Sequence, residues 1–99
     1  MEAAPTTIDE LTIARDGDDR FAPRRELKKQ VLSEGAWPTV LYEFEELKRT
    51  KKGESWGEPK LALVRYRKLK GSLKFQKEFA LNKEIAAVLG QALREWLAD

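Results

Sequence analysis

The chain of 99 residues contains neither cysteine nor histidine. Disulfides, thiol nucleophiles, zinc fingers and histidine-based proton shuttles are therefore excluded. The acidic cluster of Glu43, Glu45 and Glu46 does not indicate a metal or catalytic site, because strand alternation points Glu46 to the opposite face. We expect a protein that acts by binding, with no enzymatic activity, no metal and no cofactor.

Long hydrophobic runs are also missing. The longest apolar run, Ile85 to Leu89, is far shorter than the roughly 20 residues that span a bilayer. The first five residues lack the basic and apolar regions of a signal peptide. These absences predict a cytoplasmic protein with no membrane partner.

The length fits a single domain, and 41% hydrophobic residues can supply its core. Residues 1–20 carry six acidic and two basic side chains and few large apolar ones. Such a segment cannot bury enough surface to repay its ordering entropy. We therefore expect residues 1–20 to form a mostly disordered acidic tail, and residues 21–99 to form one α+β domain.

Charge is distributed unevenly along the chain, although the formal net charge is only +2. The segment from Lys48 to Lys77 holds eleven basic and two acidic side chains, a net charge of +9, and the rest of the chain carries −7. A neutral total therefore conceals a basic segment, and such a segment predicts a polyanionic partner.

A short helix is predicted before the first strand. Pro23 suits a helix start, Leu27 and Val31 fall on one stripe, and Gly35 stops the pattern after Leu32. Residues 40–47 then alternate as a half-buried strand whose inward side chains are Val40, Tyr42 and Phe44. Residues 50–59 hold two glycines and a proline, which predicts a loop.

Two further strands, Leu61 to Leu69 and Ser72 to Phe79, are predicted to form a hairpin around Lys70 and Gly71. A two-residue turn sets the register, with Tyr66 opposite Phe75 on the inner face and Arg67 opposite Lys74 on the outer face. The inward side chains of the two strands are expected to be Ala62, Val64, Tyr66, Leu73, Phe75 and Phe79. On the outer face, Glu43 and Glu45 could pair with Arg65 and Arg67, which is the structural alternative to a ligand-binding role for these arginines.

The last element is an amphipathic helix that Asn82 caps and that runs to Leu97, with apolar residues at spacings of three and four. Trp96 is expected in the core or in a helix-mediated dimer contact. The predicted fold is thus an antiparallel sheet of three to four strands backed by a C-terminal helix, with a short helix before the first strand.

The basic segment predicts a phosphate-binding surface, although a solvated sheet face is the alternative. Trp56 lies among its densest lysines, where it could stack on an unpaired base or anchor a loop. The candidate nucleic-acid-binding residues are Lys48, Arg49, Lys51, Lys52, Trp56, Arg65, Arg67, Lys70 and Lys74.

The segment from Glu58 to Leu97 resembles the transcriptional positive-cofactor-four family of single-stranded DNA-binding proteins. The resemblance is carried by Glu58-Pro59-Lys60, by Leu61-Ala62-Leu63-Val64-Arg65, and by Phe79 to Glu84 at the start of the last helix. It implies a curved antiparallel sheet, a homodimer formed through the C-terminal helix, single-stranded DNA as ligand, and a role in transcription regulation or DNA metabolism. It also implies that Arg65, Lys70 and Lys74 line the binding groove.

Two alternatives remain open. The order helix, three strands, helix is that of the double-stranded RNA-binding domain, which reads RNA partly with lysines at the start of its last helix; only Lys83 stands there. A protein-interaction adaptor whose basic patch meets an acidic partner is the alternative from a different class.

Overall fold

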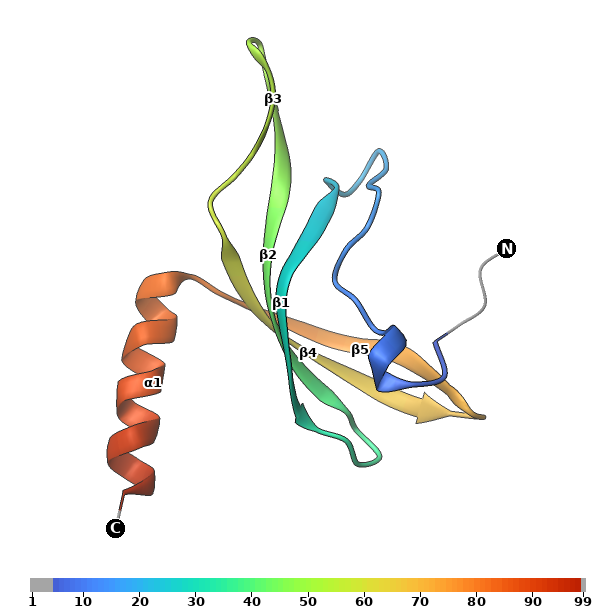
Figure 1. The fold of residues 1–99 in the computed structure, drawn as a ribbon, viewed down its shortest axis with the longest axis vertical. Helices are drawn as coiled ribbons and strands as arrows, with labels where there is room; N and C mark the ends of the chain where they lie inside the picture. Colours follow the sequence, from blue (N-terminus) through green and yellow to red (C-terminus); the bar gives the residue numbers. More distant parts are fainter. Residues whose placement is uncertain (1–4, 99) are drawn as a thin grey trace.

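The computed structural model describes residues 5–98. It shows an open, curved antiparallel sheet followed by one helix (Figure 1). The α+β class is confirmed, with five strands where three to four were expected. The elements are η1 (Ile8–Glu10), β1 (Arg24–Ser33), β2 (Thr39–Thr50), β3 (Gly53–Trp56), β4 (Lys60–Leu69), β5 (Ser72–Leu81) and α1 (Lys83–Leu97).

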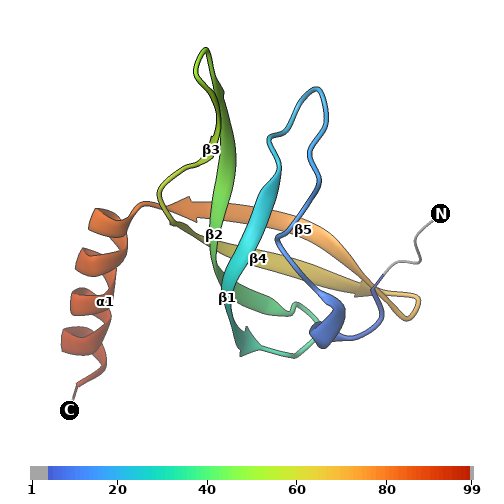
Figure 2. The same ribbon diagram turned by 45° about the horizontal axis from the view of Figure 1, so that its top comes forward.

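The sheet has the order β1-β2-β4-β5, so β1 and β5 form its two edges. The long strand β2 pairs with β1 and β4 over most of its length, and its last four residues pair with β3. The β2–β3 hairpin therefore projects beyond the main sheet (Figures 1 and 2). Residues 50–59, predicted as a loop, contain β3, a strand that the sequence did not predict.

The predicted helix from Pro23 to Leu32 is wrong, because this segment forms the edge strand β1. Its pairing with β2 is shifted after Glu26 and again after Val31. Both irregularities place a leucine, Leu27 or Leu32, out of the regular alternation, and both leucines are exposed. The apolar spacing therefore imitated a helix, while the open edge of β2 supplied the hydrogen-bond partners for a strand.

The predicted β4–β5 hairpin is confirmed, and its register is confirmed from the turn as far as Tyr66 and Phe75. Tyr66 faces Phe75, Arg67 faces Lys74, and the turn residues Lys70 and Gly71 both have positive φ, as a two-residue hairpin turn requires. Next to Arg65 the register shifts by one residue. The shift reverses the facing of the rest of β5.

This shift overturns the prediction that Phe79 points inward. Phe79 lies opposite Leu63 on the outer face, whereas Glu78 lies opposite Val64 on the inner face. Phe75 shares the inner face with Tyr66 as expected, yet it is 62% exposed, because the core does not extend over it. A β-bulge thus placed one phenylalanine on each side of the same strand.

The core lies against one face of the sheet, here called the inner face. It contains the predicted residues Val40, Tyr42, Phe44, Ala62, Val64, Tyr66 and Leu73. Leu11 and Ile13, from the segment before β1, complete it with exposures of 4% and 7%. The Tyr42 and Tyr66 hydroxyls lie 2.9 Å apart in a buried hydrogen bond.

The N-terminal segment, residues 5–20, differs from the expected disordered tail. The Lys29 ammonium, on the inner face of β1, donates to the carbonyls of Ile8 at 2.7 Å and Leu11 at 2.8 Å. At the far side of the sheet, the Leu73 amide donates to the Pro5 carbonyl at 2.7 Å. Leu11 and Ile13 of this segment pack into the core against the sheet. The domain therefore begins before residue 21. Residues 1–4, which also belong to the expected tail, lie outside the described residues.

Helix α1 begins after Asn82, whose side chain accepts a hydrogen bond from the Ile85 amide at 2.7 Å, as predicted. The helix does not back the sheet: it projects from the end of β5 (Figures 1 and 2), and none of its residues is buried. Ile85, Val88, Trp96 and Leu97 are each more than half exposed. Within residues 5–98, no helix combines the length and apolar content needed to cross a membrane.

Candidate nucleic-acid interface

The basic segment does not form one continuous surface. Lys48, Arg49, Lys51 and Lys52 lie at the tip of the β2–β3 hairpin, whereas Arg65, Arg67 and Lys74 lie near the other end of the sheet. Thr39 and Thr50 mark the two ends of β2, and eleven steps of about 3.3 Å separate them by roughly 35 Å. The predicted site residues therefore fall into two groups.

The second group is centred on Trp37, in the β1–β2 loop. This loop runs beside β4, where Tyr66 donates its amide to Pro38 at 2.8 Å and Lys68 donates to Ala36 at 3.3 Å. The hydroxyls of Ser33 and Thr39 each donate to the Trp37 carbonyl at 3.3 Å. The two backbone bonds hold the loop beside β4 and continue the pairing of β2 with β4.

Two arginines of β4 flank the Trp37 ring. The guanidinium carbons of Arg65 and Arg67 lie 5.0 and 5.5 Å from its centre, within the range of a cation–π interaction. The ring itself remains 43% exposed. Arg65 lies opposite Lys77 and Arg67 opposite Lys74 on the neighbouring strand. We call Trp37, Arg65, Arg67, Lys74 and Lys77 the tryptophan patch.

The four cations of this patch have no acidic partner within residues 5–98. The alternative pairs with Glu43 and Glu45 do not form, because Arg65 faces Thr39 of β2 and Glu43 faces Leu61. Glu45 pairs instead with Arg25 at 2.7 Å. Each cross-strand pair of cations costs about 0.2 to 1 kcal/mol, a cost that a bound anion would remove.

The hairpin tip is arranged differently. Arg49 pairs with Glu54 at 3.2 Å, with both side chains mostly exposed, so this contact adds little stability. Trp56 lies on β3 and not in a loop, opposite Leu47 of β2. The Arg25 guanidinium covers one side of its ring at 4.4 Å. Trp56 is 36% exposed, close to the 43% of Trp37, so its two predicted roles, base stacking and anchoring, stay predictions.

Lys70 lies in the β4–β5 turn, just beyond the pair of Arg67 and Lys74. It therefore extends the tryptophan patch toward the end of the hairpin. The patch also continues along β5 into a shallow hollow of about 220 Å³ that Leu63, Arg65, Lys77 and Phe79 help to line. The residues that sequence reasoning missed are Trp37, Lys77 and Phe79. Their contacts depend on the β2–β4 register and on the β5 bulge, and neither leaves a local signal in the sequence.

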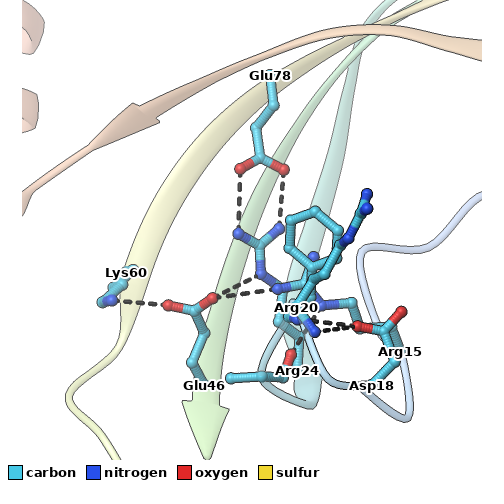
Figure 3. A network of polar contacts seen from close by, with 9 residues as sticks. Arg15, Asp18, Arg20, Arg24, Glu46, Lys60 and Glu78 are labelled. Carbon is cyan, nitrogen blue, oxygen red and sulfur yellow. Dashed lines mark hydrogen bonds and ion pairs between the residues drawn. The ribbon is translucent and has the colours of Figure 1, made fainter.

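A second charged cluster lies at the inner side of the sheet (Figure 3). Arg24 donates to Glu78 at 2.8 and 3.1 Å and to Glu46 at 3.0 Å, and Lys60 donates to Glu46 at 2.7 Å. Burial opposes ionisation of Glu46, yet the hydrogen bonds from Lys60 and Arg24 prevail and lower its pKa. Opposite charges are matched here, so the cluster serves the fold. No group of residues suited to hold a metal ion occurs in the described part of the chain.

Comparisons of the chain with models of protein families, with curated proteins and with solved structures found no match. The resemblance to the positive-cofactor-four family therefore stays a prediction. We therefore base the proposed function on the geometry of the tryptophan patch.

Proposed function

We propose that this protein binds nucleic acid without catalysing a reaction, prefers single strands, and acts as a homodimer in transcription regulation or DNA metabolism. The observation that supports this most directly is the exposed side chain of Trp37, with the guanidinium carbons of Arg65 and Arg67 at 5.0 and 5.5 Å from its ring centre. A base that stacks on the indole ring would take the place of a guanidinium group, which could then bind an adjoining phosphate.

Unpaired bases suit this arrangement better than a duplex does. The flat face of a base is available to Trp37 only when the base has left its stack. A duplex RNA reader would need a basic cluster at the start of its last helix. Here α1 begins with Lys83 followed by Glu84, so its first turn carries no net charge.

The outer face is the side of the sheet that remains open to a long ligand. On the inner face, Leu11 and Ile13 cover the centre of the sheet. The outer face carries the tryptophan patch at one end, and Trp56 and Arg49 of the β2–β3 hairpin at the other. A single strand that reaches both ends would have to span the roughly 35 Å length of β2.

The proposed homodimer is inferred from the exposed side chains of α1. A 15-residue helix that buries none of its side chains, and exposes Val88, Trp96 and Leu97 at 69% or more, leaves an apolar stripe in water. Such a stripe marks a contact surface. Gly90 has no atom within 4 Å of the position that a Cβ would take, so a second helix could approach there. A second copy of the chain would offer the same stripe in return.

Fluorescence anisotropy with labelled single-stranded DNA, duplex DNA and duplex RNA, at two salt concentrations, tests the proposal. We expect the tightest binding to the single strand, and a steep loss of affinity with salt. In a variant that keeps Trp37 as its sole tryptophan, with Trp56→Phe and Trp96→Phe, the oligonucleotide should quench the fluorescence. Absence of binding to all three nucleic acids at about 50 mM salt would exclude the proposal and favour the adaptor with an acidic protein partner. Preference for duplex RNA would favour the RNA-binding alternative.

A further inference from the structure

A cavity of about 480 Å³ lies on the inner face, between the N-terminal segment and the edge strand β5. Its floor is apolar and includes the buried residues Ile13, Val64 and Tyr66. Phe21 and Phe75 line it as well and are 53% and 62% exposed. The cavity thus presents two large aromatic side chains to solvent above a hydrophobic floor, in a volume typical of ligand sites.

The polar groups of its wall are mostly satisfied within the protein. Arg24 and Glu78 bind each other through two hydrogen bonds. Arg15 donates from Nε to the Ala22 carbonyl at 2.7 Å and lies 4.8 Å from the centre of the Phe21 ring. Its side chain is 31% exposed, and a guanidinium carries five donors, so Arg15 can still donate to a ligand.

The cavity is next to the tryptophan patch, across the thickness of a single strand. Phe75 follows Lys74 in β5, and the two side chains point to opposite faces. Because β5 is the last strand of the sheet, no further strand separates these faces at that edge. A flexible polymer held by Lys74 and Lys77 on the outer face can therefore turn over the edge and reach Phe75.

We propose that this cavity is a base-binding subsite, in which one nucleobase of the bound single strand lies against Phe75 and accepts a hydrogen bond from Arg15. The inference rests on the proposed function, because the strand is the polymer that binds at the tryptophan patch. A nucleobase combines the two properties that the cavity selects: a flat apolar face for Phe75 and Phe21, and ring carbonyl or nitrogen acceptors for a guanidinium.

Affinity for a 20-nucleotide oligothymidylate gives the first test. Phe75→Leu keeps an apolar side chain but removes the ring, and we expect it to weaken binding about tenfold, whereas Phe75→Tyr should stay within about twofold of the unchanged protein. Leu32→Ala is the matched control, since Leu32 is another exposed apolar residue and lies outside the lining of this cavity. Equal affinities of Phe75→Leu and the unchanged protein would overturn the inference.

A second measurement separates stacking from an indirect effect on the fold. The methyl signals of Ile13 and Val64 can be followed by NMR while the oligothymidylate is added. A base in the cavity should shift both signals through its ring current, and Phe75→Leu should reduce the shift. Unmoved methyl signals in a protein that does bind the oligonucleotide would also overturn the subsite. A protein that binds no oligonucleotide at all would instead contradict the proposed function.

Discussion

Arg24 and Glu78 join the two opposite edges of the sheet. Arg24 lies on β1 and Glu78 on β5, with two intervening strands, yet the guanidinium donates to both carboxylate oxygens at 2.8 and 3.1 Å (Figure 3). In a flat sheet, three strand spacings would separate these backbones by about 14 Å. The contact therefore depends on the strong curl of the sheet, and it helps to hold that curl.

Replacement of Arg24 by methionine should destabilise the protein by about 2 kcal/mol, because Glu46 and Glu78 would each lose a partly buried, charged hydrogen-bond partner. The midpoint of urea unfolding measures this loss. Arg25→Met is the control: Arg25 is the next residue, and its pair with Glu45 is half exposed, so we expect a loss below about 1 kcal/mol. Equal losses in the two variants would contradict the role of Arg24 in joining the edges.

Lys77→Ala should change stability and binding in opposite directions. Removal of Lys77 relieves the repulsion that it exerts on Arg65 across the strands, so the free energy of unfolding should rise by about 0.2 to 1 kcal/mol. The same change should weaken binding of single-stranded DNA and reduce the slope of log K against log salt by about 0.7. Urea unfolding and anisotropy titrations at several salt concentrations check the two effects.

A solvated sheet face, without a phosphate ligand, would give the first effect of Lys77→Ala without the second. The control for this experiment is Lys28→Ala, which removes a lysine that lies opposite Glu43 at the other edge of the sheet. We expect the salt slope of this control to remain that of the unchanged protein.

Trp96→Glu should turn the homodimer into a monomer. A charge on the apolar stripe of α1 cannot be buried against a second copy without a large desolvation cost. Sedimentation equilibrium measures the mass, and Gln91→Glu, which adds the same charge at an exposed polar position of the helix, should leave the dimer intact. A monomeric mass for the unchanged protein at micromolar concentration would contradict the dimer.

Alkaline pH should destabilise the fold through Tyr42 and Tyr66. Burial raises the pKa of both hydroxyls, and the hydrogen bond between Tyr42 and Tyr66 raises that of Tyr42 further. Unfolded tyrosines ionise near pH 10, so above that pH the unfolded state releases protons that the folded state retains. The contribution to stability is complete below pH 10 and declines as the pH rises.

Urea midpoints between pH 8 and 11 measure this decline. The double change Tyr42→Phe and Tyr66→Phe removes both hydroxyls and leaves no unpaired partner, so its midpoint should depend less on pH. An identical pH dependence of the variant and the unchanged protein would show that other groups cause the alkaline loss.

Local signals predicted some of these elements well. The β4–β5 register followed from the turn at Lys70 and Gly71, and α1 followed from the Asn82 cap and the spacing of its apolar residues. Strand β1 could not be recognised from the sequence, because its bulges move Leu27 and Leu32 out of the alternation that marks a strand. The position of α1 away from the sheet could not be predicted, since an amphipathic stripe does not specify which surface will cover it.

The candidate site was predictable to a similar extent. Alternation along β4 placed Arg65 and Arg67 on one face, and the hairpin register added Lys74. Trp37 required the β2–β4 register, which brings a loop residue beside a strand almost thirty positions later in the chain. Pairing between distant segments sets that contact, and the local sequence around Trp37 contains no trace of it.

The bond between Leu73 and the Pro5 carbonyl has a consequence for the order of events during synthesis. Leu11 and Ile13 leave the ribosome early, but the strands that cover them follow much later in the chain, and β5 comes last of all. The hydrophobic core therefore cannot close until β5 has emerged. Contacts between such distant segments slow folding. We expect the nascent chain to acquire protease resistance in one late step, once β5 has cleared the exit tunnel.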